Sequence, residues 1–385
     1  MKILEVTNLF APVHGGVAEA VFQLCKQLVK RGHDVTLYTS DYKLTQEYIA
    51  QIPEVKVRAF KTWLALSNLH VTPGIIGAKK EIRHFDVIHV NNYRTFQNIV
   101  ICHYAKQYGV PYVLQSHGGV MPVLQKKGLK AVYDKVVGYK ILQNASKVIA
   151  GNATEVGEYK KMGVSEDRVI IIPPFYNTEE FSNLPPPGQF REKYGIKEKH
   201  IILFLGRIHQ IKGIDFLIDA FHQLSRQRED VKLAIVGPDG GYKATLDEQI
   251  ARLGLGQKVL FTGLLGGVDK VAALEDAAML VQTSIYERGP GSPFEAILCG
   301  TPIIITKNTG AGEMVGRLDA GYLVEYGNIP DLAGLMQKVL DDPAEIMAKT
   351  KKARQYIIDN LSWQKGVEQF ERLYQSAMGK GQKEN

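Results

Sequence analysis

The chain has 385 residues, 45% of them hydrophobic and 23% charged, which is typical of a soluble globular protein and argues against a disordered or membrane-spanning one. A chain of this length is too long for one ordinary hydrophobic core and predicts two domains. Its formal net charge of +7 favours an anionic partner, which a nucleotide, a nucleic acid or a lipid surface would each satisfy.

Cysteine usage and the N-terminal residues indicate the compartment. Cys25, Cys102 and Cys299 lie far apart inside apolar patterns, without the spacing of a metal or redox motif. The first ten residues have the pattern of a short strand rather than a signal peptide, and no later run approaches the roughly 20 apolar residues of a transmembrane helix. We therefore expect a cytoplasmic protein with buried, reduced cysteines.

The first half of the chain alternates short apolar runs with helical or irregular connections. Strands are predicted at residues 3–7, 35–38, 55–60, 86–90, 112–115, 147–150 and 169–172. Residues 17–28 carry apolar side chains at helical spacing, and the glycine at position 32 ends that helix. This alternation predicts a doubly wound α/β domain.

Two loops of the first half contain candidate binding residues. Gly15 and Gly16 precede the first helix, where they would either let the backbone approach a phosphate or form a tight turn. His117 follows the strand at 112–115, at the edge of the sheet where ligands bind, and its ring can hydrogen-bond a hydroxyl or a phosphate oxygen. A structural loop histidine is the alternative.

The second half repeats the α/β pattern. Strands are predicted at residues 201–205, 232–236, 258–262, 279–282 and 302–306, after a stiff proline-rich segment at 184–188 that marks the domain boundary. Arg207 and Lys212 stand between a strand end and a helix start, where they can neutralise a diphosphate or remain solvated loop cations. Pro238 lies in a turn after the strand at 232–236, at the same edge of the sheet. This turn would either lie near a bound nucleoside or have no binding role.

The stretch at residues 284–306 is predicted to form a strand end, a Gly/Pro loop, a helix and a strand. Glu287 and Glu295 are separated by seven residues, and Ser292 before Pro293 is expected to cap the helix. Free amides of the loop and of the helix start would bind an anion, while Glu287 accepts hydrogen bonds from a sugar. The alternatives are a capping box of Ser292 and Glu295, and a solvated Glu287.

These motifs together resemble the retaining glycosyltransferases of family 4. The resemblance begins with the two glutamates and the Cys299-Gly300-Thr301-Pro302 run and extends over nearly the whole chain. It implies the GT-B fold, in which two doubly wound Rossmann-like domains face a central cleft. We expect an acceptor-binding domain at residues 1–183, a nucleotide-sugar-binding domain at 184–361, a helix at 362–378 that packs back on the first domain, and a disordered tail at 379–385.

The resemblance also implies roles for individual residues. Arg207 and Lys212 would hold the pyrophosphate, Glu287 the sugar hydroxyls, Glu295 the ribose, and His117 the donor sugar. The remaining donor-site positions are in loops: Gly15, Gly16, Pro238, Gly289, Gly291 and Ser292. The family needs no metal or other cofactor, and no Asp-x-Asp motif is present.

The leading hypothesis is transfer of a hexosyl unit from a UDP- or GDP-sugar to a lipid-linked or glycan acceptor, in glycan or glycolipid biosynthesis. One alternative is a sugar-nucleotide epimerase of the same fold, which the glutamate pattern disfavours. A second is a nucleic-acid-binding protein, suggested by the basic charge. We expect no nucleic-acid partner, because the chain lacks aromatic residues interleaved among basic ones.

The segment at residues 124–147 is strongly basic. Asp134 is its single acid, against six lysines: Lys126, Lys127, Lys130, Lys135, Lys140 and Lys147. Helical spacing places Leu129, Val132, Val136 and Tyr139 toward the core, and Lys126, Lys130 and Lys140 on another side with Tyr133 and Val137. Such a helix predicts either peripheral binding to an anionic membrane, on its inner face, or a solvated basic surface.

Overall fold

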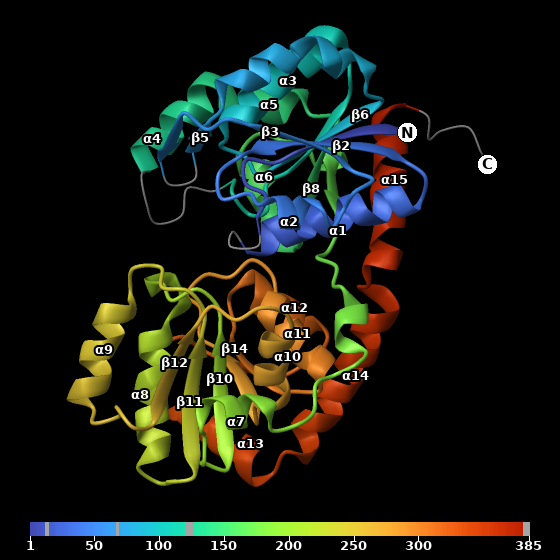
Figure 1. The fold of residues 1–385 in the computed structure, drawn as a ribbon. Helices are drawn as coiled ribbons and strands as arrows, with labels where there is room; N and C mark the ends of the chain where they lie inside the picture. Colours follow the sequence, from blue (N-terminus) through green and yellow to red (C-terminus); the bar gives the residue numbers. More distant parts are fainter. Residues whose placement is uncertain (12–14, 67–68, 121–126, 380–385) are drawn as a thin grey trace. The chain divides into compact units, whose positions relative to one another are not determined.

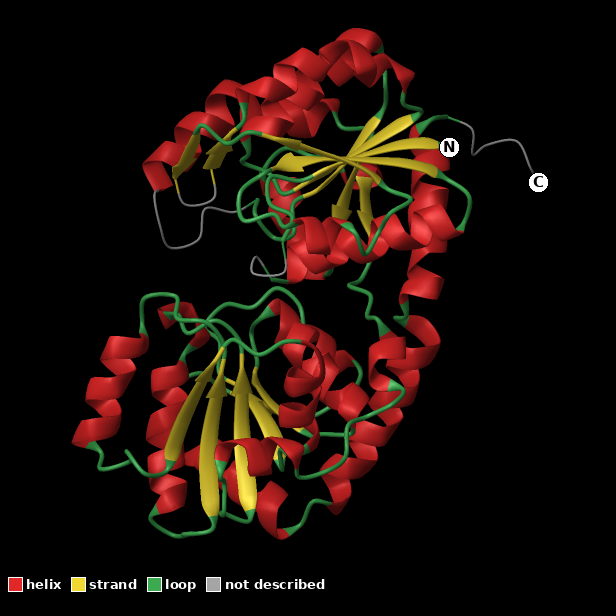
Figure 2. Cartoon of the chain, in the orientation of Figure 1, coloured by secondary structure: helices red, strands yellow, loops and turns green. Residues whose placement is uncertain are grey.

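The protein is described here by a computed structural model that covers residues 1–11, 15–66, 69–120 and 127–379. The chain divides into two compact units: unit 1 comprises Met1–Phe175 with the residues from Trp363 on, and unit 2 comprises Tyr176–Ser362. Each unit is an α/β domain built on a parallel sheet, as the sequence pattern predicts. Figure 2 shows the two sheets in yellow.

The division between the units falls at Phe175 and Tyr176, earlier than the expected boundary after residue 183. The ring of Phe175 packs on Trp363 within unit 1, whereas the Tyr176 hydroxyl donates to a backbone carbonyl of unit 2 at 3.1 Å. The proline-rich segment also belongs to unit 2, because the Gly188 N–H donates to the Asp276 carboxylate at 2.5 Å. The boundary that composition predicts therefore lies later in the chain than the one in the structure.

Unit 1 contains, within its described residues, a seven-stranded parallel sheet in the order β3-β2-β1-β6-β7-β8-β9. The predicted strands are all present, with ends shifted by a residue or two. Their bounds are β1 Lys2–Val6, β2 Asp34–Ser40, β3 Lys56–Phe60, β6 Val87–Asn91, β7 Tyr112–Gln115, β8 Lys147–Ala150 and β9 Val169–Ile171. The central strands are buried on both faces, which explains their near-continuous apolar sequence.

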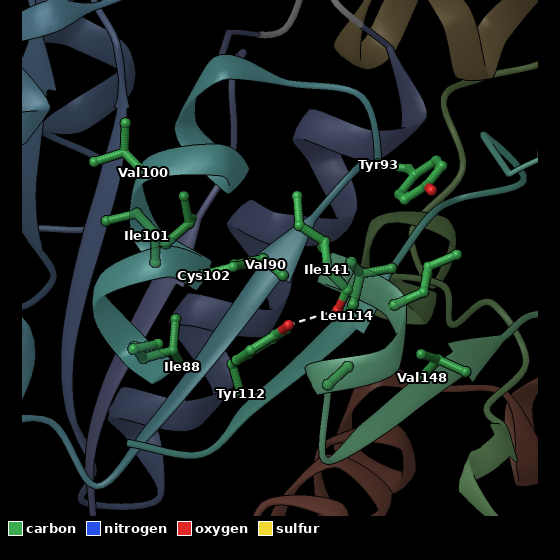
Figure 3. Packing of buried hydrophobic residues seen from close by; sticks show 14 of the residues in the cluster. Ile88, Val90, Tyr93, Val100, Ile101, Cys102, Tyr112, Leu114, Ile141 and Val148 are labelled. Atoms are coloured by element: carbon green, nitrogen blue, oxygen red, sulfur yellow. Dashed lines mark hydrogen bonds between the residues drawn. The ribbon is translucent and has the colours of Figure 1, made fainter. Parts of the chain in front are cut away.

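Helices cover both faces of this sheet, and a small hairpin lies beside it. The helices are α1 Gly16–Lys30, α2 Gln46–Ile49, α3 Phe96–Tyr108, α4 Lys127–Tyr133, α5 Tyr139–Asn144, α6 Ala153–Lys161 and α15 Trp363–Ala377. The hairpin, which the sequence analysis did not predict, pairs β4 Leu64–Leu66 with β5 Leu69–Val71. Figure 3 shows the core, where Ile88, Val90 and Leu114 of the strands lie near Ile101 and Cys102 of α3.

The last helix, α15, packs on unit 1, where it lies beside α1 (Figure 1). Phe370 and Tyr374 of α15 are buried, and Glu371 accepts from Arg31 at 2.7 Å at the end of α1. The helix therefore returns to the first domain although its sequence follows the second. Residues 380–385, for which a disordered tail is expected, lie outside the described residues.

Unit 2, every residue of which is described, has a six-stranded parallel sheet in the order β12-β11-β10-β13-β14-β15. The strands are β10 His200–Leu205, β11 Val231–Val236, β12 Val259–Gly263, β13 Met279–Gln282, β14 Ile303–Thr306 and β15 Tyr322–Val324; the last was not predicted. The helices are α7 Gln189–Tyr194, α8 Ile214–Ser225, α9 Lys243–Arg252, α10 Gly267–Glu275, α11 Gly291–Cys299, α12 Gly310–Arg317, α13 Ile329–Asp341 and α14 Ala344–Asn360.

Each sheet has a point where its strand order reverses direction, between β1 and β6 in unit 1 and between β10 and β13 in unit 2. In an open α/β sheet the connections on either side of such a point run to opposite faces and leave a crevice at the carboxyl ends of the strands. The loops after β1, β6, β10 and β13 therefore border the crevices where a ligand would bind.

The basic segment is helical, but its buried face is opposite to the expected one. Asp134–Gly138 form a π-helical turn between α4 and α5. Val132 is 60% exposed and Val136 is 62% exposed, while Tyr133 and Val137 pack on the core. Both faces carry apolar side chains at helical spacing, so periodicity could not decide between them. Residues 124–126 and the side chains of Lys127 and Leu129 lie outside what the structure describes.

A buried ion pair fixes this orientation. The guanidinium of Arg94 contacts both carboxylate oxygens of Asp134, at 2.9 and 2.5 Å, and both side chains are largely buried. Gly138 lies against the Tyr93 ring, where a Cβ would come within 2.4 Å of the hydroxyl. Among the residues described, no helix is both long and apolar enough to cross a bilayer.

Candidate active site

The connection between β10 and α8 carries both predicted diphosphate ligands. Arg207 follows the strand and is exposed, and Lys212 closes a short 3₁₀ turn before α8. Gly213 caps α8 with a φ of 59°, and a Cβ there would lie 2.2 Å from the Thr283 carbonyl oxygen. Only glycine fits this turn, which brings the loop after β10 against the loop after β13.

Lys212 and Glu287 come together at this edge. The ammonium of Lys212 forms an ion pair with the Glu287 carboxylate, and the two side chains are only 19% and 17% exposed. Oε2 of Glu287 also accepts from the Gln282 amide at 2.7 Å and from the Ser284 hydroxyl at 3.2 Å. A carboxylate held by one charged and two neutral donors is well fixed in position.

The helix α11 begins differently from the expectation. Its N-cap is Pro290 and no side chain caps it, so Ser292 is not the cap. The hydroxyl of Ser292 instead donates to the Leu205 carbonyl at 2.9 Å, which ties α11 to the end of β10. Gly291 is exposed at the first position of the helix, and its N–H is among the backbone donors that a helix start leaves without intrahelical partners.

Glu295 does not form the capping box that was its alternative role. Its Oε1 accepts from Lys270 of α10 at 3.1 Å, and Glu180 lies 3.5 Å from the same ammonium. Burial alone would lower the pKa of Lys270, but the two carboxylates outweigh it and raise the pKa. Glu287 and Glu295, which seven residues separate in the chain, thus belong to different ion pairs.

The Pro238 turn packs against the Arg207 loop. The Pro238 carbonyl accepts from the Ile208 N–H at 2.9 Å, and a Cβ on Gly237 would lie 1.9 Å from the Gly206 carbonyl oxygen. A Cβ on the neighbouring Gly240 would lie 2.9 Å from Cγ of Arg207. The loops after β10 and β11 therefore pack against each other beside Arg207.

His209 lies in the loop after β10 and has no role in the sequence-based predictions. Its Nδ1 accepts from the Ile211 N–H at 3.2 Å and so caps the 3₁₀ turn that ends in Lys212. Desolvation, followed by the charges of Arg207 and Lys212, lowers the pKa of His209. The position of a histidine between two cations in one loop was the available sequence signal.

In unit 1, His117 lies at the carboxyl edge of the sheet as predicted. Its backbone φ is 48°, a conformation that few non-glycine residues adopt and that concentrates at functional sites. Nε2 of His117 lies 2.8 Å from Oδ1 of Asn91. Arg94 holds the following turn, because its guanidinium donates to the Gly119 carbonyl at 2.6 Å.

The point of reversal in unit 1 gathers amide side chains that the sequence analysis missed. Asn91 ends β6, and the Nδ2 of Asn92 donates to Oδ1 of Asn8 at 2.7 Å in the loop after β1. Two asparagines directly after an apolar strand were the signal for them. Gly15 caps α1 with a φ of 78°, and Gly16 begins that helix, next to residues 12–14, which are not described.

The described residues contain no group of three or more His, Cys, Asp or Glu side chains arranged to hold a metal ion. What unit 2 assembles at this edge is an anchored carboxylate that pairs with Lys212, next to the starts of α8 and α11, with Arg207 exposed in the same loop as Lys212. Such a set can bind a phosphate-bearing ligand that also has hydroxyl groups. The fold and this edge together fit a class of two-domain Rossmann-like α/β proteins that bind phosphate-bearing ligands.

Comparison with known proteins agrees with that class. Residues 188–368 match the family described as glycosyl transferases group 1, and residues 14–180 match Glycosyltransferase Family 4. An uncharacterised glycosyltransferase of Methanocaldococcus jannaschii is 28% identical over 98% of this chain and 99% of its own. A Mycolicibacterium smegmatis protein named GDP-mannose-dependent alpha-(1-6)-phosphatidylinositol monomannoside mannosyltransferase is 25% identical over 94% of this chain and 95% of its own.

Solved structures share the fold. The Anabaena protein HepE, crystallised with UDP and glucose, superposes with a TM-score of 0.82 at 20% identity over 98% of this chain and all of its own. Sucrose-phosphate synthase of Thermosynechococcus elongatus gives a TM-score of 0.80 at 21% identity, over 98% of this chain and 99% of its own. The chain belongs to the family 4 glycosyltransferases of the GT-B fold, and it is a glycosyltransferase.

Proposed function

We propose that the protein is a retaining glycosyltransferase that transfers a hexosyl unit from a UDP- or GDP-sugar to a lipid-linked or glycan acceptor in glycan or glycolipid biosynthesis. The observation that carries the donor assignment is the edge of unit 2, where Lys212 and the anchored Glu287 lie in the loops after β10 and β13. The diphosphate of a nucleotide sugar supplies negative charge for Arg207 and Lys212. The sugar that it carries supplies hydroxyl groups that donate to the Glu287 carboxylate.

Each residue then has a role in the transfer. Arg207 and Lys212 neutralise the charge that grows on the departing diphosphate, the main electrostatic demand of the reaction. Glu287 accepts hydrogen bonds from the sugar, and Glu295 exchanges part of its contact with Lys270 for the ribose hydroxyls. His117 meets a hydroxyl of the donor sugar. The two cations replace a metal ion in this scheme, so we propose that transfer continues in the presence of a chelator.

The donor is tested by thermal unfolding with UDP-, GDP- and ADP-sugars, because a ligand that binds the native state raises its apparent stability. A stabilising donor is then incubated with and without candidate acceptors, and the anomeric configuration of the product is read by NMR. Donor sugar that changes configuration without any acceptor would instead favour the epimerase. If no nucleotide sugar shifts the unfolding temperature, the donor assignment fails.

A surface of unit 1 supports a lipid acceptor. Val132, Val136 and Tyr139 are exposed along one side of the basic helical segment, and Lys135 and Lys140 are exposed beside them. Apolar side chains next to lysines suit the interface of an anionic membrane, where each lysine near the surface contributes about 1 kcal/mol. We propose that the protein acts in the cytoplasm, peripherally bound to the inner face of the membrane through this side.

Liposome sedimentation tests the membrane proposal. Binding to anionic vesicles should exceed binding to neutral ones and weaken at high salt. Val136→Ser should reduce it severalfold, since it removes an apolar contact. Val268→Ser is the matched control, because Val268 is also 62% exposed but belongs to unit 2. Equal, negligible binding to both kinds of vesicle would refute membrane association and leave the transferase proposal intact.

A further inference from the structure

A buried carboxylate lies behind His117. Glu5 occupies the central strand β1 and is fully buried, in a strand whose other residues are mostly apolar. Three groups converge on it: the Tyr374 hydroxyl donates to Oε1 at 3.0 Å, the Asn91 amide donates to Oε2 at 3.0 Å, and His89 Nδ1 lies 3.1 Å from Oε1 and 2.9 Å from the Tyr374 hydroxyl. These partners are buried as well, so the hydrogen bonds are made in a low-dielectric interior where their direction matters.

The carboxylate determines which way the Asn91 amide points. The NH₂ group of Asn91 faces Glu5, because Nδ2 of Asn91 donates to Oε2 of that carboxylate. The carbonyl oxygen of the same amide is then turned to His117, whose Nε2 lies 2.8 Å away. Because a carbonyl also only accepts, Nε2 must be the donor of that hydrogen bond.

We propose that Glu5 and Asn91 are positioning residues that hold His117 as its Nε2–H tautomer. In the neutral ring the other nitrogen, Nδ1, is then an acceptor, so a ligand hydroxyl that meets it must donate its proton. The φ of 48° at His117 adds a backbone constraint to the same orientation. The consequence for sugar binding rests on the proposed function, whereas the tautomer itself does not.

An isosteric change at Glu5 gives a sharp test. In Glu5→Gln the amide oxygen should stay with the Tyr374 hydroxyl, which donates to Oε1, and this leaves an NH₂ group facing Asn91. Two NH₂ groups cannot pair, so Asn91 should turn over and present its own NH₂ to His117. Nε2 must then accept, and the ring should convert to the Nδ1–H tautomer.

The readout is the imidazole nitrogen spectrum of histidine-labelled full-length protein without ligand, with His117 assigned by His117→Gln. The wild type should contain the Nε2–H form, and Glu5→Gln should shift the tautomer ratio at least roughly fivefold toward Nδ1–H, as expected for one buried hydrogen bond. Tyr374→Phe is the matched control: it removes a donor to Glu5 but leaves the carboxylate facing Asn91, so the tautomer should not change.

Two outcomes would overturn the inference. One is an Nδ1–H form of His117 in the wild type, a measurement that does not depend on any variant. The other is an unchanged His117 tautomer in Glu5→Gln that is shown to be folded. Under the proposed function, Glu5→Gln should also lower transfer roughly fivefold or more while the affinity for free nucleotide stays the same. An inverted tautomer with unchanged transfer would support the positioning of His117 and refute its contact with the donor sugar.

Discussion

Lys212→Met offers the most direct test of the diphosphate site, since methionine keeps much of the side-chain length and removes the charge. A hydrogen bond to a charged group contributes about 1.5–3 kcal/mol, so the affinity for the nucleoside diphosphate should fall roughly tenfold to 150-fold. Stability should fall too, because Glu287, 17% exposed, loses its cation. Two neutral donors remain at Glu287, which limits that loss to about 1–3 kcal/mol.

The two effects separate in a double variant. Lys212→Met with Glu287→Gln should recover stability, because no unpaired carboxylate remains, but should not recover nucleotide affinity. Lys349→Met is the matched control: Lys349 pairs with Asp319 in unit 2, and its side chain is 24% exposed. Calorimetric titration with UDP or GDP and urea unfolding provide the two measurements. A Lys212→Met affinity within about twofold of wild type would refute the diphosphate assignment.

The other predictions concern the same edge of unit 2. Arg207→Ala should lower turnover about tenfold or more while the protein stays folded, and unchanged steady-state kinetics would contradict its role. Glu287→Gln should reduce discrimination among donor sugars, whereas Glu295→Gln should lower the affinity even for free nucleotide. If Glu295 only pairs with Lys270, Glu295→Gln will lower the stability measured by urea unfolding and leave the affinity measured by titration unchanged. The lowered pKa of His209 means that the unfolded chain takes up a proton first as pH falls below the ordinary value of 6.5, so the free energy of unfolding decreases there. His209→Asn keeps an acceptor for the turn and should lose less stability than wild type over that range, and identical pH profiles would be the contrary result.

Much of the fold could be predicted because strand and helix positions follow from local patterns. Runs such as residues 86–90 and 302–306 each contain three β-branched apolar residues, which is typical of a strand buried on both faces. The site loops were predicted for a similar reason: Arg207, Lys212 and Glu287 follow strand ends, and the carboxyl ends of parallel strands share an edge. No long-range information was needed for either.

Helix orientation and capping required the tertiary structure. Residues 127–144 have apolar side chains on two faces, and the choice between them depended on the pairing of Asp134 with Arg94, a contact that spans 40 positions. Ser292 has the sequence context of a helix cap, yet its hydroxyl reaches the Leu205 carbonyl instead. A side chain with several possible partners takes whichever the fold brings near, and local sequence does not contain that distance.

The sequence by itself determined the two α/β domains, the family resemblance and the residues that line the edge of unit 2. Only the tertiary structure decided how the site residues pair: Lys212 with Glu287 and Glu295 with Lys270 in unit 2, and His117 with Asn91 in unit 1. The physical reason is range. Hydrophobic periodicity and backbone conformation act over a few residues, whereas a hydrogen bond or ion pair in a low-dielectric interior depends on which distant side chains meet there.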